Sequence, residues 1–157
     1  MKIVFLVIGK TSERWLKEGI EVYLKRLQHY QDTAIIVLPE VKGGGKMNPD
    51  ILKKAEAQVF QKFIAPSDFV VLLDEKGHQY DSRGFANQIQ KWRNLGPKKL
   101  VFVVGGAFGF SSTLFNRANA VLSMSTMTTS HQLIRIIFLE QLYRAMTILR
   151  GESYHND

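Results

Sequence analysis

The segment from Leu100 to Phe110 constrains the fold more than any other part of this chain, because an apolar run leads directly into a glycine-rich turn. The run Leu-Val-Phe-Val-Val is mostly β-branched or aromatic, which predicts a strand buried on both faces. Three of the next five residues are glycines, and glycine lets the backbone turn where a side chain would clash. Ser111 or Ser112 is then expected to cap a helix. This order of strand, turn and helix N-terminus is typical of the edge at which open α/β sheets bind ligands.

Five apolar runs, each followed by a helical pattern, predict the fold class. The expected strands are Lys2–Ile8, Ala34–Leu38, Phe69–Leu73, Lys99–Val104 and Ala120–Ser123. The expected helices begin after Thr11 or Ser12, at Asn48-Pro49, after Asp81 or Ser82, at Ser112 and at His131, and the last one extends to Leu149. Strands that alternate with helices indicate an α/β fold with a mainly parallel sheet and helices on both faces, in a single domain over residues 1–157.

Two of these helices carry an apolar stripe at three- and four-residue steps, which predicts the face that each buries. In the first helix the stripe consists of Leu16, Ile20, Tyr23, Leu24 and Leu27. In the second helix it consists of Ile51, Leu52, Ala55, Val59 and Phe63.

Composition limits the chemistry that the chain can carry out. It contains no cysteine, which excludes disulfides, thiolate nucleophiles and zinc sites built on cysteine. The four histidines lie far apart without metal-ligand spacing, so we expect no metal cofactor. The formal net charge of +7 indicates either a polyanionic partner or simply a basic soluble protein. The glycine-rich loop with Lys42 and Lys46 is a candidate for phosphate contacts, or else a solvated flexible loop.

The apolar segments at the two ends of the chain differ in what they predict. The run Ile3–Ile8 is short and lacks a small-residue cleavage pattern, so it indicates a strand rather than a signal peptide, and we expect a cytoplasmic protein. The last helix is apolar on nearly every side, which would expose much apolar area on a monomer. Charged residues such as Arg135 and Glu140 interrupt it and exclude a membrane span. We therefore expect one face to meet the sheet and another to meet a second copy, in a homodimer.

The loops after the third, fourth and fifth strands carry the candidate binding residues. The carboxyl ends of parallel strands meet at one edge of a sheet, so Leu73, Gly105 and the run Met124–Thr129 are expected to lie near one another. The glycine turn matches neither the P-loop pattern nor the dinucleotide pattern G-x-G-x-x-G. It is either a tight connection that needs positive φ or a ligand contact, and three glycines favour ligand contact.

Cationic and titratable residues of the last helix and tail are the candidates for chemistry. Arg144 has a glutamate four residues before it, which is also the spacing of an ordinary surface ion pair. Arg135 and Arg144 are nine positions apart and therefore face opposite sides of the helix. They cannot both serve one site within a subunit, although a dimer could bring one of them to the partner's site. Tyr154 and His155 lie in a polar tail where fraying is the default, yet a phenol beside an imidazole suits acid–base chemistry or base stacking. His131 either caps the last helix or takes part in the site.

Short motifs along the whole chain are shared with one known family. They are Met1-Lys2-Ile3 with Val7-Ile8-Gly9-Lys10, Leu73-Asp74 with Gly77, Val104-Gly105-Gly106 with Gly109, Leu122-Ser123 with Met127-Thr128, His131-Gln132 with Arg135, Glu140-Gln141-Leu142-Tyr143-Arg144-Ala145, and Arg150-Gly151-Glu152 with Tyr154-His155. Together they make the chain resemble the small SPOUT-class methyltransferases of the ribosomal RNA large subunit methyltransferase H family, which modify a pseudouridine of 23S ribosomal RNA at N3. The chain departs from the family's pattern at Thr129-Ser130, where a bulky apolar residue and a proline are usual, and at Asn156, where a basic residue is common.

The resemblance implies a fold, a methyl donor and a partner. It implies a deep trefoil knot in the C-terminal part and a homodimer joined through that region. It also implies S-adenosylmethionine as methyl donor, with no metal. The implied substrate is 23S ribosomal RNA within the ribosome, and no DNA or membrane is expected as a partner. Matched position by position, the donor is expected to contact Leu73, Gly105, Met124, Ser125, Thr126, Met127, Thr128 and Thr129. Arg144, Tyr154 and His155 match positions implicated in catalysis or substrate binding.

The resemblance also leads to a hypothesis for the mechanism. N3 of the target base loses its proton and attacks the methyl carbon of the sulfonium directly, without a covalent enzyme intermediate. Arg144 is expected to stabilise the deprotonated base, His155 to accept the proton, and Tyr154 to position or stack the base. Two other functions stay open: a ribosome-binding module that has the fold without the chemistry, and an enzyme that binds a nucleotide at the glycine turn.

Overall fold

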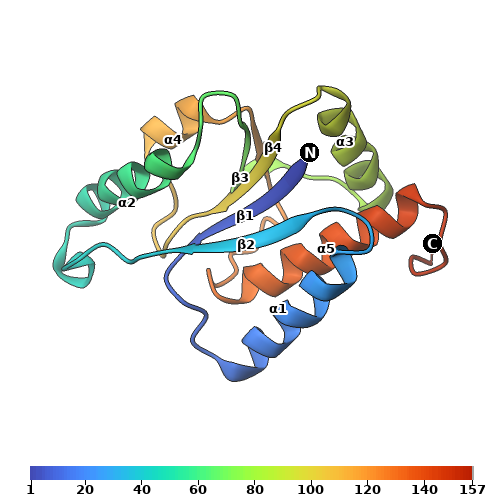
Figure 1. The fold of residues 1–157 in the computed structure, drawn as a ribbon. Coiled ribbons are helices and arrows are strands. Elements are labelled where there is room, and N and C mark those ends of the chain that lie inside the picture. The colour runs from blue at the N-terminus through green and yellow to red at the C-terminus, as the bar shows by residue number, and fades with distance from the viewer. Residues whose placement is uncertain (157) are drawn as a thin grey trace.

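The computed structural model describes residues 1–156, which form a five-stranded sheet between two layers of helices (Figure 1). The strands are β1 (Lys2–Ile8), β2 (Thr33–Leu38), β3 (Phe69–His78), β4 (Lys99–Val104) and β5 (Ala120–Leu122). Their order is β2-β1-β4-β3-β5, and every neighbouring pair is parallel. The predicted parallel α/β sheet is confirmed.

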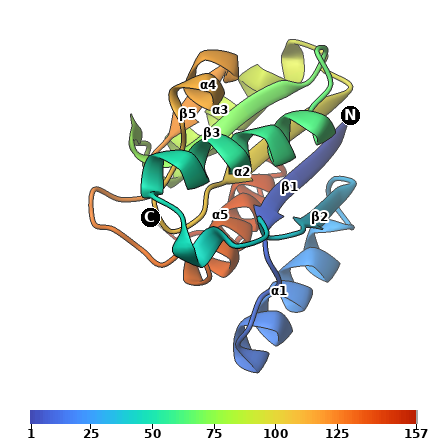
Figure 2. The same ribbon diagram turned by 90° about the vertical axis from the view of Figure 1, so that its left-hand side faces the viewer.

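Helices cover both faces of this sheet (Figures 1 and 2). One face carries α1 (Arg14–Leu27), α3 (Ser82–Asn94) and α5 (Leu133–Leu149), and the other carries α2 (Pro49–Phe63) and α4 (Ser112–Arg117). A short 3₁₀ turn, η1 (Gly44–Lys46), lies between β2 and α2.

The strands are apolar throughout because alternate residues belong to two separate cores. In β1, the side chains of Ile3, Phe5 and Val7 pack under α1, α3 and α5. Those of Val4, Leu6 and Ile8 pack under α2 and α4 on the opposite face. Phe138 of α5 lies over the two central strands, with its ring centroid 4.7 Å from those of both Phe5 and Phe102. Burial on both faces explains why these strands lack the polar alternation of a one-sided sheet.

The surroundings of α5 account for much of its apolar pattern, and the predicted homodimer stays a prediction. None of its residues is exposed, because the helix lies between α1 and α3 and packs on the sheet beneath them. At Gly19 of α1 the two helices lie close together, since a Cβ there would overlap the terminal methyl of Ile136. The apolar pattern is thus explained to a large extent within one chain and does not by itself require a second copy. Among the described residues no helix is long and apolar enough to cross a membrane.

The observed start of a helix agrees with the predicted one where the predicted capping side chain bonds to the helix. It differs where that side chain makes other contacts. Asn48 accepts a hydrogen bond from the backbone N–H of Asp50 at 2.8 Å, so α2 begins as predicted. Helix α1 instead begins at Arg14, after Glu13 as its N-cap, because Thr11 is buried against another side chain. Helix α5 begins at Leu133 rather than at His131.

The buried face of α2 differs from the predicted stripe. Ile51 is 58% exposed, and the fully buried positions of the helix are Glu56, Ala57 and Phe60. Phe60 packs beside Phe110, with 6.5 Å between ring centroids. The helix is therefore rotated about its axis from the expected orientation, because the large Phe60 ring fills the space under the sheet. The expected stripe lies on the side of the helix, where it is only partly covered.

Strand β3 extends beyond its predicted end. Residues 74–77 were expected to turn away, yet β3 continues to His78, and both Leu73 and His78 align with Leu122 of β5. The intervening residues form an irregularity in which Asp74 Oδ1 accepts a hydrogen bond from the Lys76 backbone N–H at 2.9 Å. Gly77 is needed there, because a Cβ would lie 2.6 Å from the Val121 carbonyl carbon.

Arg135 is the largest fully buried side chain of the fold and joins its first and last elements. Its guanidinium donates to the carbonyl oxygens of Ile8 and Gly9, both at 2.8 Å, and to Thr11 Oγ1 at 3.0 Å. Its Nε also donates to the His131 carbonyl at 3.2 Å. The turn after β1 is thereby fixed to the first turn of α5.

We expect Arg135→Met to lower the free energy of unfolding by about 3 kcal/mol or more, since each buried carbonyl left without a donor costs about 1–3 kcal/mol. Urea denaturation of the purified proteins measures this. Arg14→Met is the matched control, because Arg14 pairs with Glu18 on the exposed surface and its loss should cost less than about 1 kcal/mol. Equal stability of the two variants would contradict the role of Arg135.

Candidate active site

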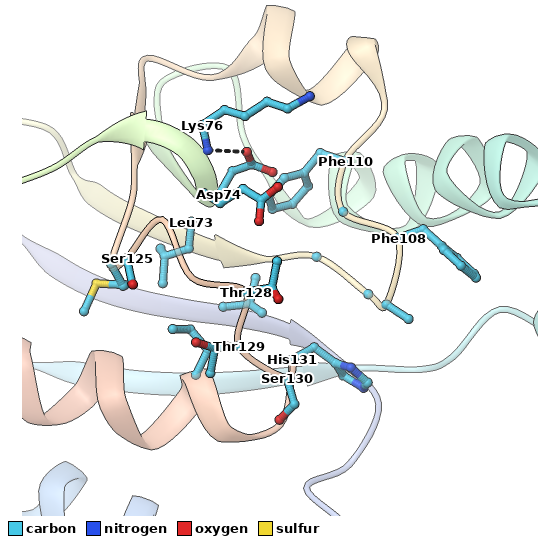
Figure 3. A pocket seen from close by; sticks show the side chains of 18 of the residues that line it. Leu73, Asp74, Lys76, Phe108, Phe110, Ser125, Thr128, Thr129, Ser130 and His131 are labelled. Atoms are coloured by element: carbon cyan, nitrogen blue, oxygen red, sulfur yellow. Dashed lines mark hydrogen bonds between the residues drawn. The ribbon is translucent and has the colours of Figure 1, made fainter.

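A cavity of about 580 Å³ lies at the carboxyl ends of β3, β4 and β5 (Figure 3). This volume is in the range of small-molecule sites. Of the eight residues predicted to bind a donor, seven line the cavity: Leu73, Gly105, Met124, Ser125, Met127, Thr128 and Thr129. Thr126 is not among the lining residues. The sheet therefore brings the three predicted loops together at one edge.

The glycine turn forms one wall of this cavity. The Gly109 backbone N–H donates to the Gly106 carbonyl at 3.1 Å, and the two residues form an isolated antiparallel bridge. Gly109 has a φ of +80°, which favours glycine, whereas Gly105 is required by close approach: its Cβ would lie 3.0 Å from the Gly109 oxygen. Backbone geometry thus accounts for both of these glycines, and contact with a ligand stays a prediction.

Short polar side chains hold the opposite wall, the loop between β5 and α5. Ser123 Oγ donates to the Ser125 carbonyl at 3.0 Å, and Ser125 Oγ accepts from the Met127 backbone N–H at 3.0 Å. Ser130 Oγ accepts from the Leu133 N–H at 3.0 Å and so satisfies one of the free donors of α5. Side chains of Leu73, Thr128 and Thr129 point into the space between the loops (Figure 3).

His131 lies at the edge of the same cavity. It does not cap α5, whose N-cap is Gln132 and whose first turn is bonded by Ser130. Burial lowers the pKa of His131 below its ordinary value, and the nearby Arg135 cation lowers it further. The imidazole is therefore neutral at neutral pH and can act as a hydrogen-bond donor or acceptor at the cavity.

Glu56 is a buried carboxyl beside this site that the sequence did not single out. Its Oε1 atom has no hydrogen-bond partner, and a Cβ at Gly106 would overlap its carboxylate. Burial raises the pKa of Glu56, and the carboxylate of Glu40 raises it further. In sequence it is one of several charged residues on an amphipathic helix, so only the rotation of α2 reveals that it is buried.

Arg144, Tyr154 and His155, the predicted catalytic residues, form a second cluster. Arg144 Nη1 lies 3.3 Å from His155 Nδ1, and its guanidinium carbon lies 4.8 Å from the Tyr154 ring centroid. The cluster is thus assembled within one chain.

Glu140 is the group that holds this cluster together, and the sequence indicated it only as an ion-pair partner. Its Oε1 accepts from Arg144 Nη2 at 2.6 Å and from the Tyr154 hydroxyl at 3.1 Å, while Gln141 donates to Oε2 at 2.8 Å. Burial, a hydrogen bond with Tyr23 and the Glu140 carboxylate raise the pKa of Tyr154 to about 12. Tyr154 therefore stays a protonated phenol at neutral pH.

The remainder of the tail is attached to the loop after α1. Arg150 Nη2 donates to the His29 carbonyl at 2.7 Å, and the Tyr30 hydroxyl donates to Glu152 Oε2 at 2.5 Å. These bonds hold Arg150 and Glu152, and fraying of the residues beyond them stays a prediction; Asp157 lies outside the described residues.

The cavity and the second cluster lie at opposite ends of α5. Ile134 lines the cavity at the start of the helix, and Arg144 follows ten residues later. At 1.5 Å per residue the two positions are about 15 Å apart along the axis. One chain therefore has both parts of the predicted site but does not bring them together.

Comparisons with known proteins assign the chain to a group of relatives. Residues 1–155 match the family model described as "Predicted SPOUT methyltransferase". A protein of Parabacteroides distasonis and one of Porphyromonas gingivalis are 44% and 43% identical to the chain over 157 residues, covering 100% of both chains in each case. A protein of Christiangramia forsetii is 44% identical over 156 residues, or 99% of each chain. All three are named "Ribosomal RNA large subunit methyltransferase H".

Two solved structures share the fold. The crystal structure of a probable methyltransferase from Bordetella pertussis Tohama I aligns with a TM-score of 0.56 at 10% identity, covering 92% of this chain and 94% of that one. A probable methylase family protein from Haemophilus influenzae Rd KW20 aligns with a TM-score of 0.52 at 10% identity, covering 99% of this chain and 70% of that one.

We expect Glu140→Gln to lower the pKa of Tyr154 from about 12, because the variant removes the negative charge that opposes ionisation of the phenol. The value should stay above that of an ordinary tyrosine, since burial and Tyr23 still act. Absorbance of the phenolate during an alkaline titration, with Tyr154→Phe as the reference, measures it. The control Glu152→Gln, which affects the hydroxyl of Tyr30 instead, should leave Tyr154 unchanged.

Proposed function

Since this chain belongs to the SPOUT methyltransferases, within the ribosomal RNA large subunit methyltransferase H family, we propose that it transfers a methyl group from S-adenosylmethionine to N3 of a pseudouridine in 23S ribosomal RNA on the ribosome. The observation that carries the proposal is the cavity built jointly by the three loops, because it is where a sheet of this type holds a small ligand. The proposal includes one SPOUT domain over residues 1–157, a C-terminal trefoil knot and a cytoplasmic location.

The residues of the cavity suit the donor. Gly105 lines the cavity, and the absence of a side chain there lets the turn at Gly109 pack against it and form a compact backbone wall. Leu73 and Met124 offer apolar surface, and Ser125, Thr128 and Thr129 offer hydroxyl groups. When bound, S-adenosylmethionine supplies a methyl group already activated by a sulfonium cation, so the chain has to position and desolvate the reacting groups.

The second cluster supplies the groups that act on the base. The Glu140 carboxylate raises the pKa of Arg144 by hydrogen bonding, so the guanidinium is a fixed cation that stabilises a deprotonated base. His155 is the proposed proton acceptor, 3.3 Å from Arg144. Tyr154, a protonated phenol, orients or stacks the base.

We propose that two copies complete each site. Because the cavity and the cluster lie at opposite ends of α5, a twofold axis that pairs these helices in antiparallel orientation places each cluster beside the partner's cavity. In this proposal the reaction requires a homodimer. The separation of cavity and cluster is the main argument for the dimer, and the apolar pattern of α5 is a weaker one.

The test of function is transfer of labelled methyl to ribosomes that lack the modification, followed by mapping of the modified nucleotide. We expect Arg144→Ala to lower kcat by about 100-fold or more with donor and ribosomes saturating, since it removes the cation that stabilises the base. Arg14→Ala, on the exposed face of α1, should leave kcat unchanged.

Calorimetry with S-adenosylmethionine, ATP and a nicotinamide dinucleotide separates the alternatives. Ribosome binding without donor binding would indicate a non-enzymatic module, and binding of ATP or the dinucleotide instead would indicate a different enzyme. Full turnover by Arg144→Ala would contradict the role of that residue.

Complementation between two inactive variants tests the shared site. Gly105→Ala places a Cβ 3.0 Å from the Gly109 oxygen and should abolish donor binding, whereas Gly45→Ala, which meets no atom within 4 Å, should not. In a mixed dimer of Gly105→Ala and Arg144→Ala subunits, one of the two shared sites keeps both functional parts. We expect such dimers to recover about half of the wild-type activity. If each site lay within one subunit, they would stay inactive.

A further inference from the structure

Two of the large apolar side chains that the fold leaves exposed lie at the donor cavity. Phe108 is 53% exposed and Met127 is 78% exposed, and both line the cavity. They come from different loops, the glycine turn after β4 and the loop after β5. A residue that lines a cavity and yet is largely exposed lies at its mouth. The mouth therefore carries an aromatic ring and a thioether that the chain itself does not cover.

Phe108 lies in a tight backbone turn. Ala107 and Phe108 are the two central residues of the turn closed by the hydrogen bond from Gly109 N–H to the Gly106 carbonyl at 3.1 Å. Figure 3 shows the Phe108 ring extending from this turn away from the centre of the cavity. The ring thus lies outside the centre of the cavity, on a backbone turn that is itself closed by a hydrogen bond.

The charges at this mouth are mixed. Lys53 and Lys76 line the cavity, but so do Asp74 and Glu75. Lys53 Nζ is moreover 3.4 Å from Asp50 Oδ1. Two cations balanced by two carboxylates do not favour a phosphate here, whereas an exposed aromatic ring favours an uncharged planar group.

Given the proposed function, we propose that Phe108 is a stacking platform for the base of a nucleotide next to the acceptor in the substrate RNA, with Met127 packing against the same nucleotide. The acceptor nitrogen has to come within about 3–3.5 Å of the transferred group, so the acceptor itself enters the cavity. Its neighbours in the strand stay at the mouth, where the Phe108 ring is. Unpaired RNA bases stack on such rings, and methionine adapts to aromatic faces.

Stacking and phosphate contacts differ in their dependence on salt, which gives the proposal a sharp test. Binding of wild-type protein and variants to ribosomes that lack the modification is measured over a range of salt concentrations. We expect Phe108→Ala to weaken binding and raise KM by about fivefold or more, with the slope of log K against log salt unchanged. Removing a lysine that contacts a phosphate, for which Lys42 and Lys46 are the candidates, should instead reduce that slope by about one.

Conservative variants and a matched control complete the experiment. Phe108→Tyr should bind as the wild type does, and Phe108→Leu, which keeps apolar bulk without a ring, should resemble Phe108→Ala. The control is Trp15→Ala, because Trp15 is an aromatic residue of α1 that is 59% exposed and does not line the cavity. It should leave binding and turnover unchanged.

Three results would overturn the proposal. They are ribosome affinity of Phe108→Ala equal to that of the wild type, a loss of S-adenosylmethionine affinity in calorimetry, or a change of oligomeric state in sedimentation. The second result would assign the ring to the donor, and the third to a second copy of the chain. Failure of the proposed function is distinguishable, because the wild-type protein would then transfer no methyl group.

Discussion

The buried guanidinium of Arg135 is the interaction on which the candidate site depends. It satisfies carbonyl groups at the end of β1 and at His131, so the loop between β5 and α5 has to end at one place relative to the sheet. That loop forms one wall of the cavity, and the glycine turn after β4, the neighbour of β1, forms the other. A cation that has no carboxylate bonded to it among the described residues thus positions a binding site by hydrogen bonds to three backbone carbonyls and one hydroxyl.

A single helix, α5, separates the site into two parts with different physical character. At its first turn are hydroxyl groups, backbone and a neutral histidine, which suit a small ligand with many polar atoms. Between its middle and its C-terminal end is a network around Glu140, in which one carboxylate oxygen binds both a cation and a phenol. Separation of the donor site from the catalytic cluster makes assembly of two copies part of the proposed chemistry.

Much of this architecture could be predicted from the sequence, because strands buried on both faces and glycine turns leave local signals. The three loops were expected to meet, and they do, since parallel strands align their carboxyl ends. Features that depend on packing between distant elements were not predicted. The rotation of α2 that buries Glu56 follows from how Phe60 fits beneath the sheet, and the late start of α1 follows from Thr11 bonding to Arg135. The exposure of Phe108 likewise becomes visible only when the turn has been placed at the mouth of the cavity.

The contacts of Arg135 also determine when this protein can become active during its synthesis. Its hydrogen bonds to Ile8, Gly9 and Thr11 join residues 124 to 127 positions apart, and the bond from Arg150 to His29 joins residues 121 positions apart. The turn after β1 therefore stays without these partners until Arg135 has left the ribosome. Contacts so distant in sequence make folding slow and place the completion of the site at its end. Neither part of the site can form before Arg135 and His155 have been made and released from the ribosome, so the site is completed only after most of the described residues are available to fold.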